Sequence, residues 1–434
     1  MRRLLVLILI VVLVAAAAVA VFLVATSSPG RGVASAAAGL DSHPLLAMVP
    51  ADATDFAFVP AAAAVWRDAQ RNPVAGPLVT SWSTRPELRH PGLVFGRADV
   101  VIWRAGDHVG FAGRVDPLRA ALVRVWIAIA GRDDLRVEGQ TVAQNLSEQT
   151  IDRGQLERLT ALASSLPPAD ALVWQTERAR GSFPPIGRPS ATAVRLTSDG
   201  VLIDSTSAQR TDDASAQRAL SLRYPEEAVA TIAFAASPGF AGELDRLLGA
   251  RVRPLLEGGG TLVIYDVDSR KLIARPLGLL VLAADDAHRA AVSNLMGSLA
   301  GMGRDVVAQS TRRVGSTEIT RREILGATVE TAETAGEILI SFDRSSMDRY
   351  LSGPAETVPA QPAIWVLRGD GSRLAPLLEA ASGNPALRFL TPKIFRSTRD
   401  ANRSIRYLSG ARRLVAHKVE GKDGEELHVV LSAK

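Results

Sequence analysis

The feature that most constrains this chain is an apolar stretch close to its N-terminus. From Leu4 to Ala25 no side chain is charged or strongly polar, and a helix needs about 20 such residues to cross a bilayer. Arg2 and Arg3 precede the stretch and only Arg31 follows it closely, which places the N-terminus in the cytoplasm by the positive-inside rule. The sequence therefore predicts a cytoplasmic stub and a single transmembrane helix over residues 1–25, with the ectodomain in the periplasm or outside the cell.

The alternative is a cleavable signal peptide, whose apolar core is usually about 7–15 residues long and ends near a small-x-small site. Ala34-Ser35-Ala36 would serve as that site, although it lies well beyond the apolar stretch and after Pro29-Gly30. Uncleaved, the protein stays in the cytoplasmic (inner) membrane; cleaved, it is secreted. Residues 26–42 are rich in Ser, Gly and Ala, which predicts a flexible tether.

Composition limits the chemistry that the ectodomain can carry. The chain has no cysteine, which excludes disulfides, thiolate metal sites, cysteine nucleophiles and a lipidated N-terminal cysteine. The net charge is +5, but Lys393–Lys418 alone holds eight basic residues against Asp400, a local +7, so the remainder sums to about −2. The basic character is therefore local, and an extracytoplasmic domain is not expected to bind nucleic acid.

In the first part of the ectodomain, the sequence predicts helices and strands in the order β-α-β-β-α-β. The strands are expected at Asp55–Val59, Ala98–Arg104 and Val109–Gly113, with helices after Pro60 and after Asp116-Pro117. Residues 136–145 are expected to add one or two short strands around Gly139. This is the order of a split β-α-β unit, with helices mainly on one face of an antiparallel sheet. Apolar residues at helical spacing predict the core-facing side of the second helix: Leu118, Ala121, Leu122, Val125, Trp126 and Ile129.

The same order returns later in the chain. Strands are expected at Ala228–Ala235, Leu262–Val267 and Leu277–Ala283, with helices that begin after Ser237-Pro238 and at a cap on Asp286. Asp116-Pro-Leu-Arg-Ala-Ala-Leu matches Asp286-Ala-His-Arg-Ala-Ala-Val, an offset of 170 residues. The fold class predicted is α+β with two related halves, over residues 43–210 and 225–434. The alternative is that a common capped helix start recurs in an Ala- and Arg-rich chain.

Each half is expected to end in an added strand and a hairpin. In the first half these are Ala171–Gln175 and the hairpin of residues 191–205; in the second they are Ile338–Phe342 and the hairpin of residues 413–431. A helix near Ser345–Leu351, a strand at Ile364–Leu367 and a helix from about Ser372 to Ala381 lie between the last two. These extra pieces suggest a partial third unit.

Two short segments carry a resemblance to a known family. Met48-Val49-Pro50-Ala51-Asp52-Ala53 leads into a strand, and Tyr407-Leu408-Ser409-Gly410 precedes the long terminal hairpin. On these residues the chain resembles a bacterial membrane-anchored envelope family that is catalogued only as a domain of unknown function. The resemblance implies a location and an architecture. It implies no activity and no site residues, because the family has none assigned.

Motifs for catalysis, metals and cofactors are weak. The six histidines are scattered without a pair at i, i+3 or i, i+4, and no G-x-S-x-G nucleophile elbow occurs. Gly258-Gly259-Gly260 leads into a strand, whereas a phosphate cradle leads into a helix. Asp285, Asp286 and His288 stand where a helix must be capped. The sequence therefore predicts a non-enzymatic protein with no cofactor and no metal.

The alternative is a periplasmic hydrolase whose catalytic groups meet only in three dimensions. Asp266 and Asp268 at a strand end, together with Asp286, are the carboxylates that would supply such a site. Two neighbouring carboxylates alone are too few to define a site for a divalent ion. A cleft that gathers several carboxylates would favour this alternative.

One local feature indicates a partner. If Lys393–Leu408 is helical, Arg396, Arg399, Arg403 and Arg406 line one face, opposite an apolar face. Such a basic amphipathic helix can lie on anionic lipid or meet an envelope protein or wall component. The alternative is an ordinary helix with solvated arginines. The oligomeric state is not addressed by these patterns.

Overall fold

The computed structural model describes residues 40, 42–77, 79, 99–106, 108–176, 189–208, 217–235, 255, 258–268, 275–302, 309–324, 327–341, 343–383, 408–420 and 424–434. The chain divides into two compact units, unit 1 ending at Ala208 and unit 2 beginning at Gln209. The apolar stretch Leu4–Ala25 and the four arginines between residues 396 and 406 lie outside the described residues. Among the described residues, no helix is long and apolar enough to cross a bilayer.

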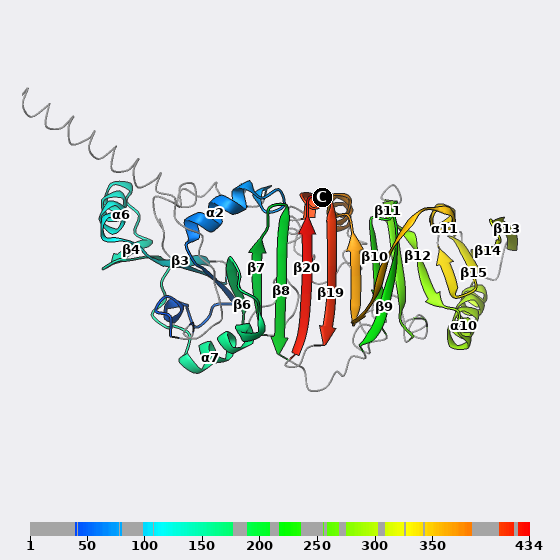
Figure 1. Cartoon of the computed structure of the whole chain (residues 1–434), viewed down its shortest axis with the longest axis horizontal. Coiled ribbons are helices and arrows are strands. Elements are labelled where there is room, and N and C mark those ends of the chain that lie inside the picture. Colours follow the sequence, from blue (N-terminus) through cyan, green and yellow to red (C-terminus); the bar gives the residue numbers. More distant parts are fainter. Residues whose placement is uncertain are drawn as a thin grey trace, which may run out of the picture. The chain divides into compact units, whose positions relative to one another are not determined.

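Unit 1 is an antiparallel sheet with helices. Its strands are β1 (Asp55–Val59), β2 (Val100–Ala105), β3 (His108–Arg114), β4 (Leu135–Glu138), β5 (Thr141–Gln144), β6 (Ala171–Gln175), β7 (Ser190–Leu196) and β8 (Gly200–Ala208). Its helices are α2 (Ala62–Arg71), α6 (Pro117–Ala130) and α7 (Arg153–Leu162), with short 3-10 helices η1 (Leu46–Met48) and η2 (Ala163–Ser165). The strands lie in the order β4-β5-β3-β2-β1-β6-β7-β8, and β6 and β7 can be followed side by side in Figure 1.

The α+β class is confirmed, but the strand order of a split β-α-β unit is wrong. β1 pairs directly with β2 in antiparallel register, with Phe56 opposite Trp103, although α2 connects them. In the split arrangement, strands joined by a helix run parallel and another strand separates them. The order of elements along a chain does not determine which strands are neighbours, because a long connection can lead back to the adjacent position as well as past it.

Both faces of the sheet in unit 1 are covered, so the prediction that helices lie mainly on one face is wrong. One face packs against α7 in a core that includes Phe56, Trp103, Trp174, Leu156 and Leu159. The other face packs against α6 in a core that includes Val100, Phe111, Val142, Ala120 and Val123. The uninterrupted apolar run Val100–Trp103 explains this, because successive strand side chains point to opposite faces.

Helix α6 forms as predicted, with its N-cap in place, but it is rotated relative to the prediction. The Asp116 carboxylate accepts a hydrogen bond from the backbone N–H of Arg119 at 2.9 Å. Ala120 and Val123 are buried in the core on the sheet, and Trp126 packs partly buried against it. Four of the six residues predicted to face the core are exposed instead: Leu118, Ala121, Val125 and Ile129.

Unit 2 has a longer antiparallel sheet. Its strands are β9 (Arg218–Pro225), β10 (Ala230–Phe234), β11 (Gly260–Asp268), β12 (Arg275–Ala283), β13 (Gln309–Val314), β14 (Thr317–Ile324), β15 (Ala327–Glu333), β16 (Glu337–Ser341), β17 (Ala355–Ala363), β18 (Trp365–Gly369), β19 (Arg413–Glu420) and β20 (Gly424–Ser432). The order is β13-β14-β15-β16-β12-β11-β10-β18-β19-β20, and β9 pairs separately with β17.

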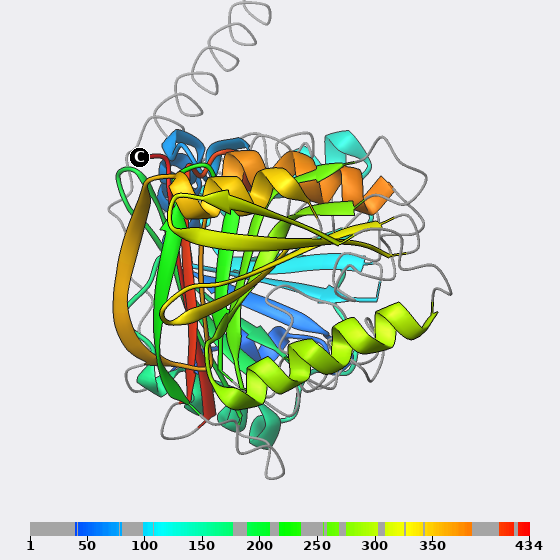
Figure 2. The same ribbon diagram turned by 90° about the vertical axis from the view of Figure 1, so that its right-hand side faces the viewer.

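The helices of unit 2 are α10 (Asp286–Met302), α11 (Arg344–Ser352) and α12 (Gly371–Gly383). Figure 2 shows α10 on one side of the strands and α11 and α12 on the other. In the cores, α10 packs with Leu282 and Ile338, and α11 packs with Leu279 and Leu339. Along their strands, the side chains of Leu279 and Leu282 point to opposite faces of the sheet, and so do those of Ile338 and Leu339. This sheet too is therefore covered on both faces.

Two assignments in the second half are corrected. The segment Ile364–Leu367 belongs to β18, which pairs with β10 and β19 inside the main sheet and is not part of a third unit. β18 beside β10 occupies the place that β6 occupies beside β1, so Ala171–Gln175 corresponds to β18 and not to Ile338–Phe342. The helix expected after Ser237-Pro238 lies outside the described residues.

Candidate functional site

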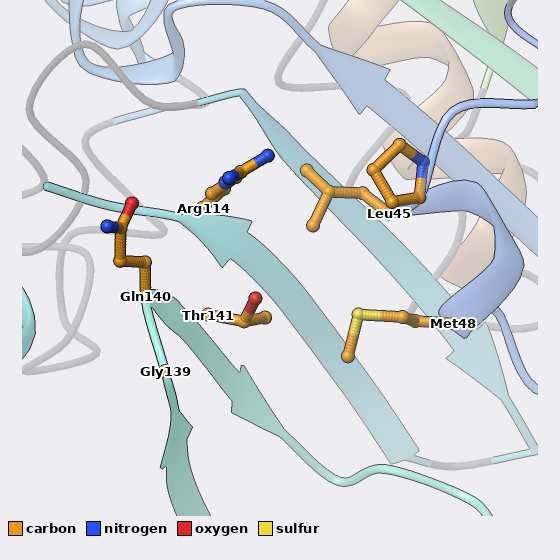
Figure 3. Close-up of a pocket in the computed structure, with 7 residues that line it drawn as sticks. Leu45, Met48, Arg114, Gly139, Gln140 and Thr141 are labelled. Atoms are coloured by element: carbon orange, nitrogen blue, oxygen red, sulfur yellow. The ribbon is translucent and has the colours of Figure 1, made fainter.

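A pocket of about 380 Å³ opens in unit 1 where η1 faces the end of β3 and the β4–β5 turn. Its lining residues are Pro44, Leu45, Met48, Arg114, Gly139, Gln140 and Thr141. Figure 3 shows Arg114, Gln140 and Thr141 on the strand side of the pocket and Leu45 and Met48 on the other. One wall is therefore polar and the other apolar, and the volume is in the range of small-molecule sites.

The apolar wall is fixed by the core of unit 1. The side chain of Leu46 is fully buried and that of Leu45 nearly so, and both belong to the core on the α7 face. The backbone N–H of Leu45 donates to Nδ1 of His43 at 3.3 Å, which holds the chain that enters η1. Met48 packs partly buried against the same core, so it presents the rest of its surface to the pocket.

The polar wall is built on a tight turn between two short strands. Gly139 has φ +58°, a left-handed conformation that favours glycine, and this lets β4 reverse into β5 within two residues. The carbonyl of Gln140 accepts a hydrogen bond from the backbone N–H of Val115 at 2.7 Å. The carbonyl of Gly139 accepts one from Arg124 Nη2 of α6, also at 2.7 Å. The turn is thus held by the end of β3 and by α6.

Among the described residues that line the pocket, Arg114 is the only charged one. Its side chain is exposed, and it forms no ion pair with any residue in the described part of the chain. A guanidinium offers five N–H donors in a planar fork that matches a carboxylate or phosphate group. With Leu45 and Met48 opposite, the pocket can hold an anionic head attached to a short hydrocarbon portion.

A second cluster lies at the start of α10. One carboxylate oxygen of Asp285 accepts from the backbone N–H of His288 at 2.8 Å, and the other lies 2.9 Å from His288 Nδ1. The hydrogen bonds from the His288 backbone and ring hold the pKa of the Asp285 carboxyl below its usual range. His288 is only 3% exposed, and its Nε2 has no hydrogen-bond partner among the described residues.

An imidazole oriented by a carboxylate is the arrangement of a general base in a catalytic triad. Here, however, the space next to the imidazole is filled by the main chain. A methyl group built on Gly258 would lie 2.3 Å from His288 Nε2 and 2.2 Å from Cε1. His288 therefore packs against the Gly258 backbone, and this cluster caps a helix and fixes the loop that leads into β11.

The other carboxylates named from the sequence do not form a site with these residues. Asp286 is fully exposed and pairs with Arg289 at 2.9 Å, so the cap of α10 is Asp285 and the prediction of Asp286 is wrong by one residue. Asp266 is exposed and follows a register shift in β11, and Asp268 is the last residue of that strand. Within the described ranges, no group of three or more His, Asp and Glu residues could hold a metal ion.

The sequence does not reveal the pocket. Arg114 was expected only as the residue after a strand, and an exposed arginine at a strand end has no distinctive local pattern. Gly139 was expected between two short strands, and this turn glycine is the one local signal near the site. Arg396, Arg399, Arg403 and Arg406, the predicted partner face, lie outside the described residues.

A comparison with protein-family models, with curated proteins and with solved structures gives no match. What the structure defines is an α+β protein whose two units each contain an antiparallel sheet covered on both faces.

Proposed function

We propose that this protein is a single-pass membrane-anchored extracytoplasmic protein that binds a ligand without transforming it. The observation that carries the binding role is the pocket of unit 1, in which the guanidinium of Arg114 faces an apolar wall. The apolar stretch Leu4–Ala25 supports the anchor. The ligand chemistry that fits is a phosphate or carboxylate on a short hydrocarbon portion, as anionic lipids and lipid-linked wall components carry.

We also propose that the ectodomain consists of two related halves. The order β5-β3-β2-β1-β6-β7-β8 in unit 1 has the same form as β16-β12-β11-β10-β18-β19-β20 in unit 2. In unit 1, α6 follows β3 and packs on one face of the sheet, and α7 packs on the other. In unit 2, α10 follows β12 and packs on one face, and α11 packs on the other. Alignment of the caps Asp116 and Asp285 places Arg114 opposite Ala283, so the pocket arginine is specific to unit 1.

The anchor is tested on the full chain expressed in a Gram-negative host. We expect it to stay in the membrane fraction after an alkaline carbonate wash, and the purified protein to have the mass of a chain that retains Leu4–Ala25. A mature chain that begins near Ala37 and appears in the periplasm would contradict the anchor. It would leave the binding proposal standing, because the pocket lies entirely in unit 1.

The binding role is tested with a short-chain phosphatidylglycerol below its micelle concentration, and with the phosphatidylcholine of equal chain length as the neutral probe. Arg114→Gln should weaken binding of the anionic probe roughly 10- to 100-fold, because a hydrogen bond to a charged group contributes about 1.5–3 kcal/mol. The matched control is Arg136→Gln, an exposed arginine on β4 that does not line the pocket. Equal binding by Arg114→Gln and Arg136→Gln would contradict the assignment of the pocket.

A periplasmic hydrolase is the second candidate, and the contact between Asp285 and His288 Nδ1 is the observation in its favour. It ranks second because the Gly258 backbone occupies the space that a substrate would need. Turnover of a simple activated ester by the purified chain, abolished by His288→Gln, would favour the hydrolase over the binding protein.

A further inference from the structure

Helix α6 presents an apolar face to solvent. Leu118 is 52% exposed, Val125 57% and Ile129 81%, and their spacing of seven and four residues places them in one stripe. Ala121 and Ala128 are also exposed. The opposite side of the helix is apolar as well and packs on the sheet. Apart from Arg119 and Arg124, the helix is apolar on every side, and a helix of that kind is normally buried all round. The exposure of Leu118, Val125 and Ile129 departs from that rule.

The corresponding helix of unit 2 provides an internal control. α10 follows β12, the strand that corresponds to β3, and it also packs one side on the sheet, through Ala291 and Met296. Its exposed side chains include Arg289, Ser293 and Asn294. The same position in the fold therefore accepts an ordinary polar surface, and the apolar stripe of α6 is not a requirement of the architecture.

We propose that the stripe of Leu118, Val125 and Ile129 lies on the outer surface of the bilayer in which Leu4–Ala25 is anchored. The inference rests on the proposed membrane anchor. Residues 26–39 connect that stretch to Leu40, which is buried in the core of unit 1. The tether predicted from the composition of these residues would have an r.m.s. reach of about 20 Å, so the anchor would hold unit 1 close to the lipid headgroups.

The charge of the helix fits this occupant. α6 contains no acidic residue, and its charged side chains are Arg119 and Arg124. Arg124 is exposed at the flank of the stripe, where an arginine can reach headgroups while aliphatic side chains enter the acyl boundary. Arg124 also donates to the Gly139 carbonyl in the pocket wall. Docking of α6 would therefore bring the Arg114 pocket close to anionic headgroups.

The absence of cysteine makes the proposal directly testable. In the full chain, Ile129→Cys is labelled with an environment-sensitive fluorophore and reconstituted into vesicles of phosphatidylethanolamine and phosphatidylglycerol. Ser293→Cys, exposed on α10, is the matched control. We expect a blue-shifted emission at position 129 that nitroxide-bearing lipid quenches and aqueous iodide does not. At position 293 we expect quenching by iodide and none by the lipid. A Val125→Asp change added to the labelled Ile129→Cys chain should reverse its pattern without changing the far-ultraviolet circular dichroism.

The outcomes separate the docking from the anchor. A chain that resists alkaline carbonate but whose label at 129 is quenched by iodide and not by lipid overturns the docking and leaves the anchor intact. A chain that carbonate extracts overturns the anchor and the docking that rests on it, and leaves the binding role of the pocket standing. The third outcome concerns Ile129→Cys chains in detergent without lipid. If two such chains rapidly form a disulfide, and the label at position 129 is protected from iodide there as it is in vesicles, a second copy is the occupant. That result overturns docking on lipid.

Discussion

His288 packs so closely on the Gly258 backbone that this position cannot hold even one more methyl group. The added carbon would lie 2.2–2.3 Å from two ring atoms of a buried side chain, and the ring is held by Asp285. We expect Gly258→Ala to lower the free energy of unfolding by about 1–3 kcal/mol, as overpacking of a filled site does. Urea unfolding measures the change.

The matched control is Gly297→Ala in α10, where nothing lies within 4 Å of the added methyl group. There the change should stabilise the protein by about 0.5–1 kcal/mol, because alanine restricts the unfolded chain and favours the helix. Equal effects of the two substitutions would contradict the packing of His288 on Gly258.

The carboxyl of Asp285 predicts a dependence of stability on acid pH. The hydrogen bond from the His288 backbone, followed by the one from its ring, lowers the pKa of this carboxyl in the folded state. Its contribution to stability is therefore fully present above the unfolded-state pKa and is lost as the pH falls through the folded value. Asp285→Asn keeps an acceptor for the cap but does not ionise.

We expect the melting temperatures of wild type and Asp285→Asn to converge between about pH 4.5 and pH 2. Thermal unfolding across that window measures the effect. A difference in melting temperature that stays constant over the window would show that ionisation of Asp285 does not contribute.

At the scale of single residues, the sequence predicts caps well and sites poorly. Asp116 was predicted as a cap and confirmed, because an Asp-Pro pair leaves one choice. In Asp285-Asp286 either residue could cap, and only the backbone shows that it is Asp285. Arg114 was missed because its pocket brings together η1 and the β4–β5 turn, which are far apart in the sequence.

At the scale of elements, a buried ion pair joins β13, β15 and α11. Arg312 binds Glu330 with Nη2 at 2.6 Å and Nε at 3.2 Å, and it also contacts Asp348. The Glu330 side chain is fully buried. In Arg312→Leu the carboxylate of Glu330 would stay buried without this partner. Loss of one partner of a buried ion pair lowers the free energy of unfolding by about 3–5 kcal/mol.

The neighbouring Arg313→Leu is the matched control, since this side chain is 74% exposed and its ion pair with Glu318 is long, at 3.6 Å. Its effect should stay within about 0.5 kcal/mol. Adding Glu330→Gln to Arg312→Leu should recover much of the loss, because the buried charge is then gone. Chemical unfolding of the three variants checks this, and an equal loss for Arg312→Leu and Arg313→Leu would contradict a structural role of the pair.

Helices and strands were predictable where one pattern dominates. β1 has large aromatic residues at alternate positions, Phe56 and Phe58, and was predicted with its observed limits, Asp55–Val59. The side of α6 that faces the core was not predicted, because apart from two arginines the sequence of this helix is apolar on all sides. Periodicity cannot choose between these sides. β13, β14 and β15 were not predicted, since these strands are rich in Arg, Thr and Glu and offer little apolar alternation.

For the whole molecule, the position of Leu40 in the core predicts where the folded body begins. Leu40, Leu45 and Leu46 are buried in the core of unit 1, between 0% and 8% exposed. A chain that starts at Leu40 loses the apolar stretch and the tether but keeps this core. We expect it to be monodisperse without detergent and to unfold at the same temperature as the full chain.

A chain that starts at Val49 is the informative comparison, because it lacks all three leucines. Shortening one buried leucine to alanine costs about 2–5 kcal/mol, and domains have only about 5–15 kcal/mol in total, so unit 1 should fail to fold. Gel filtration and thermal unfolding distinguish the two truncations. If the chain that starts at Leu40 also failed to fold, the residues before it would be part of the folded body and not a tether. The proposed freedom of unit 1 to reach the bilayer through α6 would then lose its basis.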